Sequence, residues 1–103
     1  MRNGVVWRAS SYEAKIAWVA GAQDAYMQGV FLMKLGGGCV YKIPNWFDNK
    51  STARGVITEM DSLYEDGVNI IMPLINAYEL SEMKLGGATK KQLDKYRIAI
   101  LSK

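Results

Sequence analysis

The residue whose setting most suggests chemistry is Asp24, an acid within an otherwise apolar segment. Small residues surround it in the run Gly21-Ala22-Gln23-Asp24-Ala25. An ionised carboxylate buried without partners is very costly in free energy, so Asp24 is either a structural anchor or part of a site. A general acid or base needs a partner group, and the chain has no histidine to provide one. We therefore expect Asp24 to be a structural anchor that accepts hydrogen bonds from backbone N–H groups or from a Tyr or Trp donor.

The lack of histidine excludes several kinds of site at once. It removes the Ser-His-Asp triad, the Cys-His dyad and zinc sites built on imidazole. Ser10, Ser11 and Ser51 precede predicted helices, and we interpret them as helix caps rather than nucleophiles. No residue supports a catalytic assignment, so we predict that the protein is not an enzyme.

Other acids and glycines have spacings that recur in metal and phosphate sites. Helical spacing places two pairs of acids each on one helix face: Asp61 with Glu65, and Glu79 with Glu82. We interpret both pairs as parts of solvated helix faces. Without a second set of acids facing them they do not form a metal site. The run GGGC at residues 36–39 lacks the Lys-Ser/Thr that a phosphate-binding loop requires. We predict no metal and no cofactor.

Composition and charge indicate one folded domain over residues 1–103. Half of the residues are hydrophobic and 22% are charged, which is the balance of a globular chain. A net charge of +3 argues against binding dominated by phosphate neutralisation, so we expect no nucleic-acid partner.

The charges are unevenly distributed along the chain. Cations follow from position 84 onward: Lys84, Lys90, Lys91, Lys95, Arg97 and Lys103. Acids precede them: Glu59, Asp61, Glu65, Asp66, Glu79 and Glu82. One interpretation is a solvated last helix whose cations complement the acidic middle. The other is an electropositive surface that binds an acidic partner.

Cysteine and hydropathy limit the cellular context. The single Cys39 cannot form an intramolecular disulfide, so it is a buried apolar side chain, a free thiol or an intermolecular link. No apolar run is long enough to span a bilayer, so we expect no membrane insertion. No signal peptide is visible in this chain.

A long helix over residues 10–35 is the predicted centre of the fold. Ser10 and Glu13 match a capping box at its start. The segment has two apolar stripes at helical spacing, which indicates contact on more than one side. Gly21 would let a neighbouring helix approach closely, and Asp24 would then anchor that neighbour.

The segment 36–50 is a predicted loop with many aromatic side chains. Tyr41, Ile43, Trp46 and Phe47 either fold back as a lid on the core or form an exposed patch that binds a partner. Tyr41, Trp46 and Phe47 are therefore the candidate partner-binding surface.

Three shorter helices complete the predicted all-α fold of four helices. The first runs over 52–65 with Ser51 as its N-cap. The second begins near Pro73 and ends at the glycine pair 86–87. The third follows a capping box formed by Thr89 and Gln92. No set of strands is evident, and we expect Trp7, in the short segment before the long helix, to dock on the body.

Several motifs together resemble those of the Rap1a/Tai family, small helical proteins exported by bacteria. They are GAQDA at 21–25, CVYKIP at 39–44, STARGV at 51–56, DSLY at 61–64 and PLINA at 73–77. These segments are similar to the family's G-x-x-D-A/G and C-x-I-P segments, the helix start that follows, a tyrosine-bearing helix end and a Pro-opened helix. The likeness covers about residues 12–87.

The resemblance implies an all-helical protein that is periplasmic or secreted. Characterised members are immunity proteins that block peptidoglycan amidases delivered by type VI secretion, often as dimers. On this basis we predict a non-enzymatic protein-binding domain of the bacterial envelope, of the immunity type, with an unidentified protein partner and a homodimer as a further expectation. The alternative is a structural or self-associating helical module.

Overall fold

The computed structural model describes residues 3–36 and 52–102, and it is all-α as predicted. Its elements are α1 (Gly4–Ala9), α2 (Tyr12–Gly36), α3 (Ala53–Glu65), the 3-10 turn η1 (Gly67–Asn69), α4 (Leu74–Leu85) and α5 (Lys90–Leu101). Within these residues no strand is formed, and the only extended pairing is an isolated bridge between Asn3 and Pro73. None of the described helices is long and apolar enough to cross a membrane.

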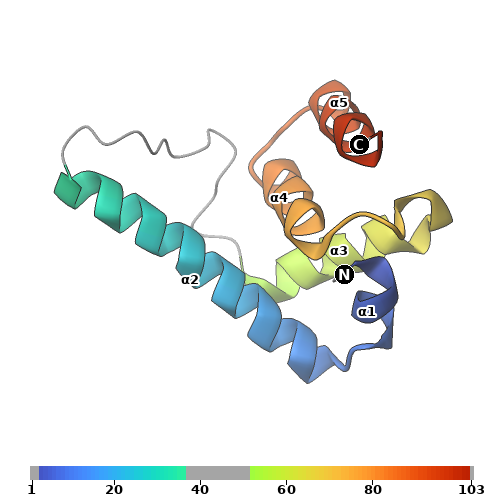
Figure 1. Cartoon of the computed structure of the whole chain (residues 1–103), viewed down its shortest axis with the longest axis horizontal. Coiled ribbons are helices and arrows are strands. Elements are labelled where there is room, and N and C mark those ends of the chain that lie inside the picture. The colour runs from blue at the N-terminus through green and yellow to red at the C-terminus, as the bar shows by residue number, and fades with distance from the viewer. Residues whose placement is uncertain (1–2, 37–51, 103) are drawn as a thin grey trace.

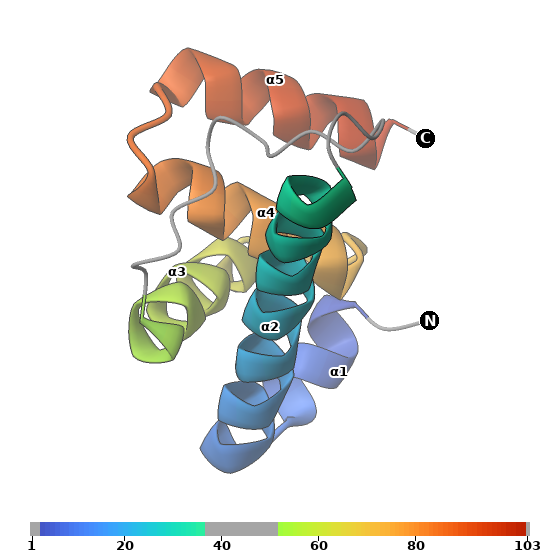
Figure 2. The same cartoon turned by 90° about the vertical axis from the view of Figure 1, so that its left-hand side faces the viewer.

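The helices are stacked around α3 and α4 (Figures 1 and 2). The helix α4 packs against α3 on one side and α5 on the other, while α2 crosses α3 and touches α4. The short α1 lies beside α3 near the start of α2. The far end of α2 extends beyond this stack.

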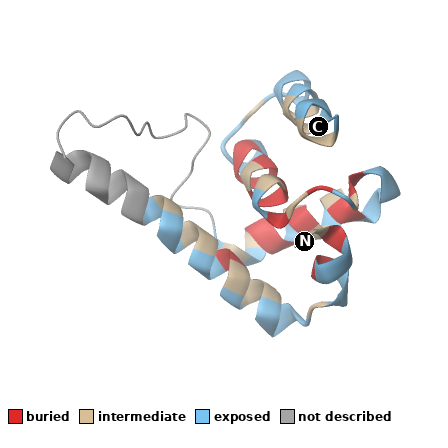
Figure 3. Ribbon diagram, in the orientation of Figure 1, coloured by how far each residue is buried: buried red, intermediate tan, exposed pale blue. Residues whose placement is uncertain are grey.

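The described helix with the most buried residues is α4, and α3 contacts the most other elements, so the prediction that the long helix over residues 10–35 occupies the centre is wrong. Seven of the twelve residues of α4 are buried: Leu74, Ala77, Tyr78, Leu80, Ser81, Glu82 and Met83. Of the residues of α2 whose burial is described, 12–27, only Val19 is buried. Figure 3 shows this contrast as red on α3 and α4 against blue and tan on α2. A stripe of α2 that includes Trp18, Ala22 and Tyr26 packs on the core, and the remaining residues between 12 and 27 are mostly exposed.

The segment before α2 is a helix that docks one large aromatic side chain. Asn3 caps α1 because its Oδ1 accepts a hydrogen bond from the backbone N–H of Val5 at 3.0 Å. Trp7 is 2% exposed and belongs to the main core cluster, which confirms that it docks on the body. Burial of such a side chain contributes about 2–3 kcal/mol to stability.

The predicted capping box at the start of the long helix does not form. Ser10 ends α1 instead, and its hydroxyl donates to the carbonyl of Val6. Ser11 takes the capping role, since its Oγ accepts from the N–H of Ala14 at 3.1 Å. The chain breaks into two helices here because Ser10 adopts an extended conformation between them.

The N-cap of α3 is one residue later than predicted, and the predicted N-cap of α5 is confirmed. The side chain of Thr52 accepts from the N–H of Gly55 at 3.0 Å and is therefore the N-cap of α3, whereas Ser51 lies outside the described residues. The predicted capping box of Thr89 and Gln92 is present in full at the start of α5.

The end of α4 is a glycine cap that sets the turn into α5. The N–H of Ala88 donates to Met83 O and the N–H of Gly87 donates to Lys84 O, at 2.9 and 3.1 Å. This is the Schellman pattern, which requires a left-handed residue. Gly87 supplies it with a φ of +94°.

Candidate functional site

Among the residues that the structure describes, no packing is seen at the two predicted anchor residues. Asp24 and Gly21 are both exposed on α2. A Cβ added at Gly21 would have nothing within 4 Å, so no described helix packs into the predicted notch. The reason is that α2 contacts the body through the face that carries Trp18 and Tyr26. Gly21 and Asp24 lie on another face of this helix.

The predicted partner-binding aromatics cannot be placed by the structure. Tyr41, Trp46 and Phe47, like Cys39, lie outside the described residues. The candidate site must therefore be found among the described helices.

A polar cluster joins α1, α2 and α3 around Asp61. Its Oδ1 accepts from the indole N–H of Trp7 at 2.7 Å and from the Lys15 ammonium at 3.0 Å. The same ammonium lies 5.1 Å from the centre of the Trp7 ring, close enough for a cation–π contact. Asp61 is thus an interhelical tie, and its side chain is still 44% exposed.

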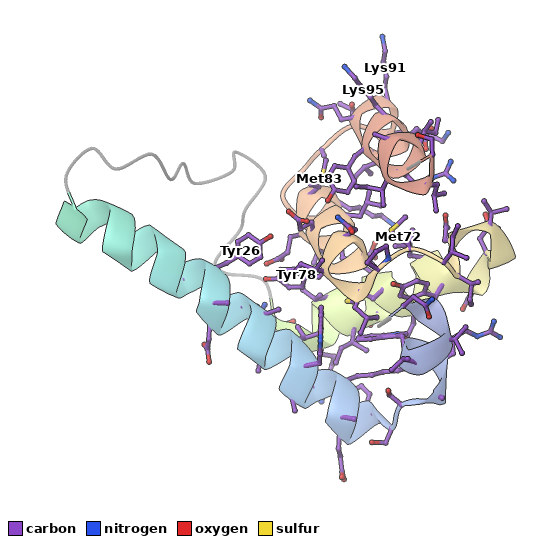
Figure 4. All side chains as sticks on the ribbon, viewed as in Figure 1. Tyr26, Met72, Tyr78, Met83, Lys91 and Lys95 are labelled. Atoms are coloured by element: carbon purple, nitrogen blue, oxygen red, sulfur yellow. The ribbon has the colours of Figure 1, made fainter. Side chains whose placement is uncertain are left out.

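A second acid, Glu82, is buried, so the prediction of a solvated face is wrong for this residue. Its side chain is fully enclosed, and its Oε2 accepts from the Tyr78 hydroxyl at 2.8 Å. Figure 4 shows Tyr26 and Tyr78 facing each other, and their ring centres are 5.5 Å apart. Burial, followed by the Glu82 hydrogen bond, raises the pKa of Tyr78 well above its usual value. The sequence carried little signal for this burial, because the polar residues of the helix over 74–85 are interleaved with apolar ones.

A third polar cluster fastens α5 to α4. The hydroxyl of Tyr96 donates to Glu79 Oε1 at 2.9 Å and accepts from Asn76 Nδ2 at 3.2 Å. Burial is the main cause that raises the pKa of Tyr96, to about 12. The ring of Tyr96 is therefore held in one orientation by two residues of α4.

The space among α3, α4 and α5 is a small, charge-compensated pocket of about 180 Å³. Lys84 pairs with Glu59 at 2.7 Å and Arg97 lies 3.8 Å from Asp94. Because these lining charges are already matched inside the protein, the pocket offers little to a charged ligand.

A larger groove of about 560 Å³ lies where α4 turns into α5. Its lining is largely apolar: Met83, Gly86, Gly87, Ala88, Gln92, Lys95, Tyr96 and Ala99. The groove is open at Gly87, where a Cβ added to the backbone would meet nothing within 4 Å. A groove of this size suits an inserted apolar side chain or a small molecule.

The outer rim of this groove is positively charged. Lys95 lines the groove, and Lys91 stands one helical turn earlier on α5. Figure 4 shows both side chains projecting from α5 on the side away from α4. Both residues are exposed. The sequence carried a signal for this rim, the i, i+4 lysine pair, but no signal for the groove beside it.

Among the residues that the structure describes, we take this groove as the candidate binding site, because it is larger than the charge-compensated pocket and has a mostly apolar lining. In the same part of the chain, no three or more acidic or cysteine side chains are grouped so that they could hold a metal ion. A scan against protein-family models and searches of curated proteins and of solved structures found no match.

Proposed function

We propose that this chain is a non-enzymatic protein-binding domain and that the α4–α5 groove is its contact surface. The observation that carries the proposal is the groove of about 560 Å³ with a largely apolar lining, open to solvent beside Met83 and Tyr96. An exposed apolar concavity is a typical place for a partner side chain to dock.

The incomplete burial of α5 supports the same proposal. None of its residues is buried, and the side chains of its inner face, Leu93, Tyr96, Ile100 and Leu101, are only partly buried against the core. A partner that covered the groove would complete the burial of this helix. The stabilisation would follow the apolar area removed from water.

The polar groups that catalysis would need have structural roles. Asp61 binds Trp7 and Lys15, and the enclosed carboxylate of Glu82 accepts from a buried tyrosine. A general acid or base must reach the substrate, and a carboxylate without solvent access cannot. This favours binding over chemistry.

The narrower role comes from the resemblance to the Rap1a/Tai family. On that basis we place the domain in the bacterial envelope, periplasmic or secreted, where it would block a cell-wall hydrolase as an immunity protein. The support for this part is the spacing of the motifs between residues 12 and 87.

Affinity capture from an envelope extract of the native host tests the proposal. Ala99 lines the groove and is exposed, so Ala99→Trp should fill the groove and abolish retention of the partner. Ala17→Trp, at an exposed position of α2, is the matched control and should retain it. A partner identified by mass spectrometry and held equally by both variants would refute the groove as the contact surface.

A second candidate is self-association, which exposed apolar side chains near the start of α4 favour. Val68, Ile71 and Ile75 are 64%, 60% and 45% exposed and lie close together in the chain. Light scattering that gave a stable oligomer, with no other protein captured, would favour this function.

A further inference from the structure

We propose that the α4–α5 groove binds an acidic segment of a partner protein, with an apolar side chain inserted beside Met83 and carboxylates facing Lys91 and Lys95. This inference rests on the proposed protein-binding function and adds the chemistry of the partner. Of the two interpretations of the basic C-terminal part, it adopts the electropositive binding surface.

The charge balance of α5 carries the electrostatic half of the proposal. Asp94 forms ion pairs with two cations, since its carboxylate lies 3.1 Å from the Lys90 ammonium and 3.8 Å from the Arg97 guanidinium. Lys91 and Lys95 form no ion pair with any acid in the described part of the chain. They repel each other across one helical turn, so a partner's carboxylates would both attract them and relieve that repulsion.

Lys95 belongs to the lining of the groove, and Lys91 lies outside the lining, one helical turn earlier on α5. Residues four apart on a helix lie on one face, about 6 Å apart along its axis. Lys95 lines the groove, and its side chain projects from α5 on the side away from α4 (Figure 4). Long cationic side chains commonly cover apolar surface with their stems while the charge stays in water.

The wall of the groove carries the apolar half of the proposal. Tyr96 presents a ring whose hydroxyl is fixed by Glu79 and Asn76, so little side-chain freedom is lost on binding. Met83 is 8% exposed at the groove, and methionine adapts readily to different apolar shapes. The small residues Ala88 and Ala99 leave room for the incoming side chain.

Other partners fit the surface less well. A cationic segment would be repelled by the rim. A nucleic acid would need a longer basic stripe to neutralise many phosphates. In the described part of the chain, the cations without an ion pair at or next to the groove are Lys95 and, one turn away, Lys91. An anionic membrane surface shares the charge but offers no single side chain of a size to fill the groove.

Three labelled peptides of equal length test the inference on the full chain. All carry leucines at the same helical spacing, and the flanking positions are Glu, Gln or Lys. Fluorescence anisotropy should show the Glu peptide binding about three- to thirtyfold more tightly than the Gln peptide, as two exposed ion pairs would give. The Lys peptide should bind least. The preference should shrink in high salt, because the lysines are exposed.

Charge reversal supplies the controls. The double variant Lys91→Glu/Lys95→Glu should prefer the Lys peptide, while Arg8→Glu, at an exposed position of α1, should keep the wild-type order. Circular dichroism will show that each variant is folded. An unchanged preference in the double variant would overturn the inference, and so would the absence of peptide binding to the wild type.

Two further outcomes separate this inference from its alternatives. If vesicles containing phosphatidylglycerol bind the wild type while no peptide does, the surface recognises a membrane and the inference is wrong. If the Glu peptide binds at the groove but the native extract yields no protein partner, the proposed function fails while the chemistry of the groove stands.

Discussion

Gly4 lies at the tightest packing point among the described glycines, where α1 meets α3 and the chain before α4. A Cβ at this position would lie 2.5 and 2.8 Å from two ring carbons of Tyr64 and 2.9 Å from the carbonyl oxygen of Ile70. The backbone N–H of Gly4 donates to the same oxygen at 2.9 Å. A side chain here must therefore displace a buried ring or break a backbone contact.

Gly4→Ala should lower the free energy of unfolding by about 1–3 kcal/mol through overpacking. Gly21→Ala is the matched control: its Cβ would meet open space, so the better helix propensity of alanine should raise stability by up to about 1 kcal/mol. Urea denaturation measures both. If Gly21→Ala is instead less stable than the wild type, the result would support the prediction that a neighbouring segment packs closely at Gly21.

Tyr64 links stability to alkaline pH. Burial raises its pKa well above the ordinary value of 10.0, and its hydroxyl donates to Met72 O at 2.7 Å. Below pH 10 the side chain is protonated in both states, so its contribution is complete. Above pH 10 only the unfolded chain releases the proton, so stability falls by about 1.4 kcal/mol per pH unit for this residue.

Tyr64→Phe should be about 1–3 kcal/mol less stable than the wild type at pH 7, because the carbonyl of Met72 loses its buried donor. That gap should narrow between pH 10 and 12, since only the wild type has a tyrosine to ionise at this position. Urea midpoints at pH 8, 10 and 11 measure the gap. A stability gap between wild type and variant that stays constant from pH 8 to pH 11 would contradict the raised pKa of Tyr64.

At the scale of elements, the turn between α4 and α5 both ends a helix and shapes the groove. Gly87→Ala would place a side chain at a φ of +94°, which costs about 1 kcal/mol. Gly67→Ala, also next to open space and without a positive φ, should be close to neutral. Thermal unfolding of the two variants makes the comparison. Equal melting temperatures would show that the cap is not required.

Element boundaries were predictable where one local signal decided them. Thr89 and Gln92 form the expected box, and the glycines after Leu85 end α4 as expected. The box at Ser10 failed because a competing residue was available: Ser11 caps α2, while Ser10 binds the preceding turn. Two adjacent serines can each cap a helix, and the sequence alone did not show which of them would do so.

At the scale of the whole molecule, the pattern of apolar residues predicted an all-α fold but misplaced its centre. The helix α2 is long and free of proline, and α4 is short, yet α4 has the largest share of buried residues among the described helices. The length of a helix and the number of its apolar stripes are properties of that helix alone. How deeply a helix is buried depends on which neighbouring helices cover it. The burial of Glu82 follows from the same enclosure.

The candidate site was predictable only in part. The lysine pair at 91 and 95 and the uneven charge were visible in the sequence, and an acidic partner was one of the two interpretations. The groove itself depends on how α5 lies against the end of α4, which is fixed by the contacts of Tyr96 with Asn76 and Glu79. Such contacts between residues far apart in the chain have no local signature.

Amide chemical-shift mapping by NMR during titration with the Glu peptide tests the central claim most directly. The account predicts that the largest shifts fall on the groove residues between Met83 and Ala99, with small shifts on the exposed face of α2 around Gly21 and Asp24. Largest shifts on α2 or α1, with the groove amides unchanged, would contradict it.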